Sequence, residues 1–189
     1  MEKYPLRAQL LSCLAMSLIA LAIIYFAQDV QWPGFLLAGL PWRQQMMMGL
    51  TLGVLVGGVS TIMALRKPND ETVRRTSASY ARLDLRGLNP VWISLGAGIS
   101  EELLFRAALQ PLLGIWLTTL LFLLVHAGAY DFRRLDRAAL WQAGGVVGMS
   151  LMFGFAYEYT GLATVIVAHV VIDIFGLYSV RRLAAGQAY

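Results

Sequence analysis

Six apolar runs, each close to the length that crosses a lipid bilayer, take up most of this sequence. A helix needs about 20 apolar residues to cross a hydrocarbon core ~30 Å thick. Lipid offers no partner to backbone N–H and C=O groups, so each run is expected to be a helix. The chain is 58% hydrophobic and 14% charged, whereas soluble domains are about half apolar and about a quarter charged. We therefore predict an all-α, polytopic membrane bundle of about six transmembrane helices, with residues 1–189 as a single integral-membrane domain. The runs cover roughly residues 6–27, 46–65, 90–110, 113–130, 140–157 and 161–180.

The connections between the runs carry turn signals and polar residues. Pro111 and Gly114 separate the third run from the fourth, which favours a tight helical hairpin. The polar stretch 66–89 spaces its arginines and leucines as an amphipathic surface helix does. The run 6–27 is too long for the apolar region of a typical signal peptide, so we expect it to remain as a membrane anchor.

Basic residues fall almost entirely on one side of the predicted topology. With the amino terminus inside, thirteen lysines and arginines lie inside and only Arg43 lies outside, while Arg106 falls within a span. Cytoplasmic loops of membrane proteins carry this excess, so both termini are predicted to be cytoplasmic. The net charge of +4 therefore reflects topology, and we expect the bilayer rather than nucleic acid as its partner. The inside residues are Lys3, Arg7, Arg66, Lys67, Arg74, Arg75, Arg82, Arg86, Arg133, Arg134, Arg137, Arg181 and Arg182.

Ionisable side chains interrupt three of the apolar runs at a similar depth. Glu101 lies nine residues before Gln110 at the outer hairpin, which is about 13–14 Å along a helix. The same count places His126 about 18 Å, His169 about 12 Å and Asp173 about 18 Å from the outer ends of their helices. A charge at the bilayer centre costs at least ~2.5–3.5 kcal/mol. We therefore expect these four side chains to converge on one cavity near the midplane.

Two explanations for this polar set are open. Glu102 and Arg106 are spaced four residues apart, so they form an intrahelical pair, and the whole set could be a structural clamp between helices. The alternative is a reaction site. Two glutamates, two histidines and an aspartate exceed what a clamp needs, which favours the reaction site.

The residue types suit hydrolysis by direct attack of water. A carboxylate and a histidine can activate water as general bases, and a second polar pair can stabilise the oxyanion that forms at a carbonyl. No nucleophile pattern accompanies them, because Ser100 lies on a different helical face from Glu101 and Cys13 lies in another run. We therefore expect no acyl-enzyme intermediate.

The motifs Glu101-Glu102-x-x-x-Arg106, Phe122-x-x-x-His126 and His169-x-x-x-Asp173 occur in this order on successive apolar runs. In this respect the chain resembles the CPBP family. These are the CAAX prenyl endopeptidases and bacteriocin-processing or Abi proteins, which are glutamic-type intramembrane proteases. The resemblance covers residues 90–180, the expected catalytic core.

The resemblance implies a role for each motif residue. It implies that Glu101 activates water with the help of His126, and that His169 and Asp173 bind the oxyanion. Glu102 and Arg106 would be supporting residues that orient Glu101, as would Phe122 in the second motif. Prenyl endopeptidases typically carry Asn where this chain has Asp173. An ionised aspartate donates no hydrogen bond, so Asp173 is expected to accept from His169 or to be neutral.

The same donor set of glutamate, two histidines and aspartate could in principle hold zinc. The sequence contains no HExxH motif, and the resemblance implies a metal-free site. We therefore expect neither a metal nor another cofactor.

Three classes of function are compatible with ionisable residues inside a membrane bundle. The first is an intramembrane endopeptidase that acts on a membrane-embedded peptide or protein. The second is a non-catalytic immunity or scaffold protein that binds a peptide partner, which would not need Glu101, His126 and His169 together. The third is a proton-coupled transporter. The short chain has no detectable inverted repeats, which argues against this class.

Several substrate classes fit the resemblance equally well. They are a pheromone or bacteriocin precursor, a membrane-anchored sorting signal and a prenylated CAAX tail. The short chain favours a prokaryotic protein of the inner, cytoplasmic membrane.

Overall fold

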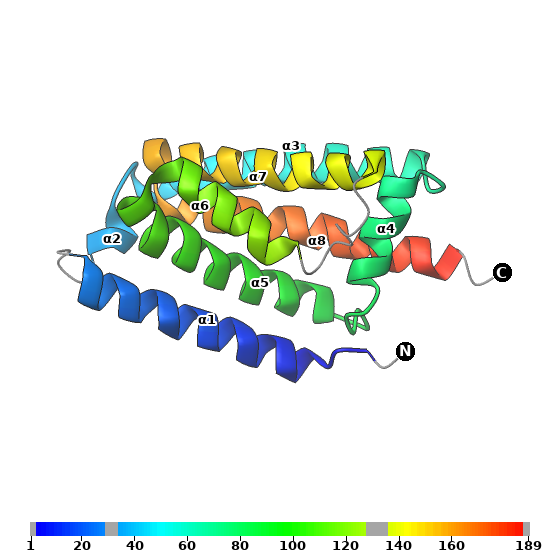
Figure 1. Cartoon of the computed structure of the whole chain (residues 1–189), viewed down its shortest axis with the longest axis horizontal. Coiled ribbons are helices and arrows are strands. Elements are labelled where there is room, and N and C mark those ends of the chain that lie inside the picture. The colour runs from blue at the N-terminus through cyan, green and yellow to red at the C-terminus, as the bar shows by residue number, and fades with distance from the viewer. Residues whose placement is uncertain (1–2, 29–33, 128–135, 187–189) are drawn as a thin grey trace.

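The computed structural model describes residues 3–28, 34–127 and 136–186, and helices account for most of them (Figure 1). Five helical stretches among the described residues are long and apolar enough to cross a membrane, so the predicted all-α polytopic bundle is confirmed. The long helices are α1 (Leu6–Ala27), α3 (Trp42–Arg66), α5 (Asn89–Glu102) with the π-helix η1 (Leu103–Leu109), α6 (Gln110–His126), α7 (Arg137–Thr160) and α8 (Leu162–Gly186). The short helices are α2 (Gly34–Leu37) and α4 (Glu71–Tyr80).

The helix bounds differ from the apolar runs mainly at their polar ends. Helix α3 begins at Trp42 rather than at residue 46, and α8 continues to Gly186 rather than ending at residue 180. Helical hydrogen bonding continues through charged residues outside the hydrocarbon, where side-chain polarity costs little, so apolarity alone underestimates these helices. The fourth run ends earlier than expected, because α6 stops at His126; residues 128–130 lie outside the described part.

The third and fourth runs form one continuous stretch of 38 residues, Asn89–His126. At 1.5 Å per residue this stretch would be about 57 Å long, nearly twice the hydrocarbon thickness. Gly114 divides it, with φ 73° and ψ 168°, and the chain turns back there (Figure 1). A positive φ of this kind suits glycine. The predicted hairpin is therefore present: the arm before Gly114 is long enough for one crossing, and the arm after it, which ends at His126, is about 18 Å long.

The π-helix η1 lies just before this turn. Pro111 has no N–H to donate to the preceding turn, and the amide of Gln110 bonds to the Phe105 carbonyl five residues back. The carbonyls of Ala107 and Ala108 instead accept hydrogen bonds from Gln28 Nε2, both at 2.8 Å. A side chain at the end of α1 thus satisfies two carbonyls that an unbroken α-helix would pair.

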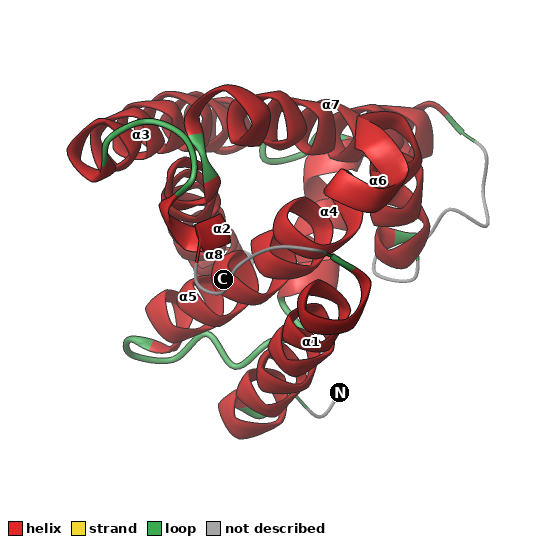
Figure 2. Ribbon diagram, turned by 90° about the vertical axis from the view of Figure 1, so that its left-hand side faces the viewer, coloured by secondary structure: helices red, strands yellow, loops and turns green. Residues whose placement is uncertain are grey.

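Helix α8 lies in the middle of the bundle, with α3, α5 and α7 around it (Figure 2). Helix α3 packs closely along it through Gly49, Gly53 and Gly57, where an added Cβ would lie within 3.1 Å of an α8 atom. Small residues at this spacing let two membrane helices approach closely. Gly58, next to Gly57 in the sequence, faces open space instead.

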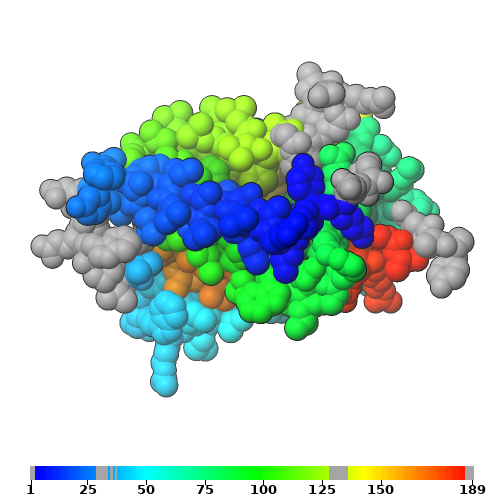
Figure 3. Space-filling view, turned by 90° about the horizontal axis from the view of Figure 1, so that it is seen from below, coloured from blue at the N-terminus to red at the C-terminus, as the bar shows by residue number. Residues whose placement is uncertain are grey.

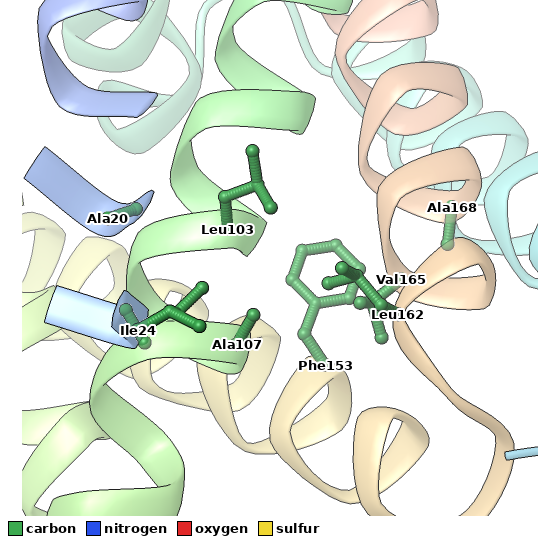
Figure 4. Packing of buried hydrophobic residues seen from close by; sticks show 9 residues of the cluster. Ala20, Ile24, Leu103, Ala107, Phe153, Leu162, Val165 and Ala168 are labelled. Atoms are coloured by element: carbon green, nitrogen blue, oxygen red, sulfur yellow. The ribbon is translucent and has the colours of Figure 1, made fainter. Parts of the chain in front are cut away.

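Apolar side chains lie on both the inside and the outside of the bundle. A buried cluster joins α1, η1, α7 and α8, and Phe153 is at its centre with Leu162 and Val165 beside it (Figure 4). Helix α1 runs along the outside (Figure 3) and exposes Leu14 and Leu18. An exterior of this kind suits lipid.

Helix α4 is the amphipathic surface helix expected within 66–89, and it packs against α7 and α8. Arg75 forms two hydrogen bonds to the Asp136 carboxylate, at 3.0 and 2.7 Å. The hydrogen bonds from Arg75 hold the pKa of Asp136 below its usual value. Gln142 Nε2 of α7 donates to Thr76 Oγ1 at 3.0 Å. These contacts hold α4 across one end of the bundle.

Both ends of the chain approach that same end of the bundle, where α1 begins and α8 finishes (Figure 1). The described basic residues predicted to be inside gather there as well, including those of α4 and the last turns of α8. An even number of crossings gives this arrangement. That this end faces the cytoplasm stays a prediction, and Arg133 and Arg134 lie outside the described residues.

Candidate active site

Glu101 and His126 face each other across the α5–α6 hairpin. Glu101 Oε2 lies 3.6 Å from His126 Nε2, and both side chains are mostly buried. The other ring nitrogen of His126, Nδ1, lies 2.8 Å from the Phe122 carbonyl. A carbonyl only accepts, so Nδ1 carries a proton. His126 Nε2 is thus the nitrogen directed at Glu101.

The Glu101 oxygen in this pair is buried and has no hydrogen-bond partner among the described residues. The separation of 3.6 Å exceeds the range of a good hydrogen bond. A buried carboxylate oxygen without a partner is costly. The arrangement therefore suits a third polar group that bonds to both Glu101 and His126.

His169 is held from the opposite side by Glu102. Its Nδ1 donates to Glu102 Oε1 at 2.7 Å, and its ring stacks on Phe153 with centroids 5.1 Å apart. Its Nε2 lies 3.6 Å from Asp173 Oδ2. His169 therefore donates its short hydrogen bond to Glu102, whereas the sequence pattern pointed to Asp173, one turn along the same helix, as the acceptor.

Glu102 also forms the predicted ion pair with Arg106. Arg106 Nε donates to Glu102 Oε2 at 3.1 Å, and both side chains are fully buried. One carboxylate thus uses one oxygen for an arginine and the other for His169. Arg106 lies over the Phe122 ring, 5.6 Å from its centroid, and Phe122 stacks on His126 at 4.1 Å. Arg106 is therefore linked to each histidine through one intervening residue. Glu102 links it to His169, and Phe122 links it to His126.

A cavity of about 280 Å³ opens beside the two histidines. Its lining includes His126, His169 and Asp173, together with α7 residues. Helix α4 closes one side through Thr72, Thr76 and Tyr80. A second cavity, of about 370 Å³, shares Asp173 and these three α4 residues and continues along α3 and α8. The two spaces meet beneath α4.

Comparison with known proteins finds a family for the segment that carries the three motifs. Residues 87–175 match the family model described as Rce1-like, type II CAAX prenyl endopeptidase. This segment is similar to the Rce1-like family. It contains all seven residues of the three motifs, and the resemblance stated from the sequence is confirmed.

The Rce1-like segment also has a curated relative. The chain is 34% identical over 84 residues to a Bacillus subtilis (strain 168) protein named uncharacterized protein YpbD. The aligned part is 44% of this chain and 41% of the relative, so the match spans about two fifths of the relative's length. None of the solved structures matches the chain.

Within the Rce1-like segment, the structure brings most of the sequence-predicted residues together. Glu101 with His126 and Glu102 with His169 form two adjacent pairs, and Asp173 reaches the cavity wall. Their catalytic roles remain predictions. Among the described residues, no group of three or more His, Cys, Asp or Glu is arranged to hold a metal ion.

Sequence reasoning missed the polar residues that surround Arg106. Arg106 Nη1 donates to Gln110 Oε1 at 3.3 Å, and Arg106 Nη2 donates to Ser150 Oγ at 3.1 Å. Gln110 stands four residues after Arg106, so its spacing was a usable signal. Ser150 lies on α7 in a run of small and apolar residues, and no local pattern distinguishes it.

Proposed function

We propose that this protein is an intramembrane endopeptidase that hydrolyses a peptide bond of a membrane-associated peptide or protein without a metal. The observation that carries the proposal is the placement of Glu101 Oε2 opposite His126 Nε2 at 3.6 Å inside the helical bundle. The Rce1-like family of residues 87–175 supports the same reaction class. The protein is an integral membrane protein, and we place it in a prokaryotic inner membrane.

In this proposal Glu101 and His126 activate the water molecule. Water donates one hydrogen bond to Glu101 and the other to His126 Nε2, because the Nδ1 proton of that ring is engaged by Phe122. As water adds to the substrate carbonyl, its proton passes to Glu101. A base positioned in this way accelerates such a step by about 10²–10⁴-fold. The proton then passes to the leaving nitrogen as the peptide bond breaks.

His169 stabilises the negative charge that develops on the carbonyl oxygen. Glu102 accepts from His169 Nδ1, which leaves Nε2 directed toward the cavity and Asp173. With both nitrogens protonated, Nε2 donates to the oxyanion, and Glu102 balances the charge of the ring. Fixed donors of this kind contribute about 10²–10³-fold. Asp173 stands beside the same oxygen and donates to it only when it is protonated.

The test is Glu101→Gln, which keeps the size of the side chain but removes the base. The probes are two fluorophore–quencher peptides, one ending in a prenylated CAAX tail and one being an unmodified apolar single-span segment. Cleavage by the purified protein in micelles should fall by at least ~10²-fold, with thermal stability unchanged. Glu71→Gln, an exposed substitution on α4, is the control. Addition of a chelator should leave the wild-type rate unchanged.

A contrary result would favour the second function class. If Glu101→Gln retained full biological function at matched membrane levels, hydrolysis by Glu101 would be excluded. The protein would then be better described as a non-catalytic scaffold or immunity protein that binds a peptide in the same cavity.

A further inference from the structure

Arg106 is fully buried and needs partners for its remaining donors. Glu102 takes only the Nε proton. A guanidinium group has five N–H donors in a fixed plane, and lipid supplies no acceptor. Gln110 and Ser150 accept from the other two nitrogens, and both are themselves buried. The orientation of Arg106 is therefore set by three side chains at once.

The Ser150 hydroxyl has a defined direction. It accepts from Arg106 Nη2 at 3.1 Å and donates to Thr119 Oγ1 of α6 at 3.2 Å. Because its single proton is used by Thr119, its lone pair is directed at Arg106. Ser150 thus connects α6 and α7 to the centre of the site.

The Gln110 amide is oriented from its other end. Its Nε2 donates to the Gly154 carbonyl and to Glu158 Oε1, both at 3.0 Å. With the nitrogen occupied in this way, the amide oxygen faces Arg106. The exposed carboxylate of Glu158 therefore helps to orient the buried Gln110 amide so that its oxygen, rather than its nitrogen, faces Arg106.

The π-helix brings these residues to one face. Successive steps of four residues advance by about 40° each on an α-helix, so Glu102, Arg106 and Gln110 would drift apart by about 80°. A π-turn closes bonds between residues i and i+5 and holds more residues, which counteracts that drift. Leu103–Leu109 forms such turns, and hydrogen bonds run from Glu102 through Arg106 to Gln110.

The structure assigns Gln110 and Ser150 as positioning residues that act on His169 through Arg106 and Glu102. This inference rests on the proposed function, in which His169 binds the oxyanion. Neither residue lines the cavity beside the two histidines. They fix the arginine, the arginine fixes one oxygen of Glu102, and the other oxygen of Glu102 fixes the His169 ring. A displacement of about 1 Å at a reacting group can cost ~10²-fold in rate.

The two histidines allow this chain of contacts to be observed directly. The chain has only two histidines, so ¹⁵N-histidine labelling gives signals from His126 and His169 alone. His169→Gln assigns the pair. Ser150→Ala and Gln110→Leu are the test variants in detergent micelles. Ser94→Ala is the matched control, because Ser94 is equally buried but its hydroxyl bonds only to the Pro90 carbonyl of its own helix.

The expected result separates the two rings. Both test variants should shift the His169 Nδ1 signal away from its hydrogen-bonded position and change the His126 signal much less, because Arg106 reaches His126 only across the face of Phe122. Ser94→Ala should change neither signal. On the two probe peptides kcat should fall by up to ~10²-fold with KM nearly constant. In the double variant Gln110→Glu/Glu158→Gln the amide and the carboxylate exchange places. Position 110 then offers Arg106 an acceptor, which Gln110→Leu lacks, so the His169 signal and kcat should return toward wild type.

Two results would overturn the inference. One is a His169 signal that is unchanged in both test variants. The other is a loss of cleavage rate that is accompanied by equal changes in both histidine signals and by a lower melting temperature, and that the double variant does not reverse. Such a result would mean that Gln110 and Ser150 have a purely structural role. If the His169 signal shifts as expected but the wild-type protein cleaves neither peptide, the positioning contact stands and the proposed reaction fails.

Discussion

His169 Nδ1 and Glu102 Oε1 lie 2.7 Å apart, in a contact that joins α8 to the end of α5. Glu102 is completely buried and also holds Arg106. Its role is therefore larger than that of an intrahelical partner for an arginine. It orients a histidine that borders the cavity with one oxygen and pairs with a buried arginine through the other.

Glu102→Gln should damage both stability and activity. The neutral amide has only one acceptor oxygen and no negative charge. The buried Arg106 therefore loses its counterion, and Arg106 and His169 no longer both have an acceptor at this position. Breaking a buried pair in this way costs about 3–5 kcal/mol, which thermal unfolding in micelles would measure. Asp173→Asn is the comparison, because Asp173 is 3.6 Å from His169 and an amide there still donates to an oxyanion. Asp173→Asn should retain measurable cleavage of the probe peptides. The role given to Glu102 would be wrong if Asp173→Asn lost more stability and cleavage activity than Glu102→Gln.

Gly145→Leu should block the cavities without unfolding the protein. Gly145 lines both spaces beneath α4, and an added Cβ there would meet no atom within 4 Å. Leucine is also a better helix former than glycine, by close to 1 kcal/mol, so stability should not fall. One extra methylene group that does not fit a pocket changes selectivity by ~10-fold or more. The KM of Gly145→Leu for the peptides should therefore rise by at least that much.

Gly144→Leu is the control for this cavity test. Gly144 is the neighbouring residue on α7, and an added Cβ there also meets no atom within 4 Å. Unlike Gly145, it lines neither cavity. Its kinetics should match wild type. Equal losses in both variants would show that the effect is on α7 itself rather than on the cavities.

Gln28→Leu should destabilise the π-helix. It leaves the carbonyls of Ala107 and Ala108 without their present partner, and an unsatisfied buried group costs about 1–3 kcal/mol. Gln9→Leu on the same helix is the control, since Gln9 Oε1 is buried without a hydrogen-bond partner among the described residues. It should be neutral or stabilising. Thermal unfolding of the two variants at one detergent concentration checks this, and equal melting temperatures would contradict the capping role.

Acidification should release α4 from α7. Because Arg75 lowers the pKa of Asp136, their contact stabilises the folded protein above the ordinary aspartate pKa of about 3.9. That contribution is lost as pH falls through the lowered value in the folded state. A nitroxide at Ala78→Cys, in a Cys13→Ser background, should show α4 held at neutral pH and mobile only in acid well below pH 4.

Arg75→Met should give the mobile spectrum already at neutral pH. Arg74→Met, which removes an exposed charge one residue away, should keep the wild-type pH profile. A spectrum of Arg75→Met that stays immobile at pH 7 would show that Thr76, through Gln142, is sufficient to hold α4.

Helix placement and polar depth follow from local sequence. Lipid forces each apolar run to satisfy its own backbone, so run length predicts the helices. Gly114, at the α5–α6 turn, and Gly161, between α7 and α8, both have positive φ and stand where the chain reverses. Glu101, His126 and His169 could be placed at one level by counting residues. That expectation needs only the helical rise and no knowledge of how the helices are rotated.

The partners within the site depend on tertiary structure. Which side chain meets His169 is decided by how α5 and α8 approach each other, and at Gly98 an added Cβ would lie 2.6 Å from Val170. That approach is close enough for Glu102 to reach across, so it bonds to His169 before Asp173 does. The π-turns that align Gln110 with Arg106, and the contact of Ser150 from α7, likewise depend on packing between helices. Sequence spacing determines which residues share a face of one helix, whereas the pairing of two faces depends on the rotation and separation that close packing selects.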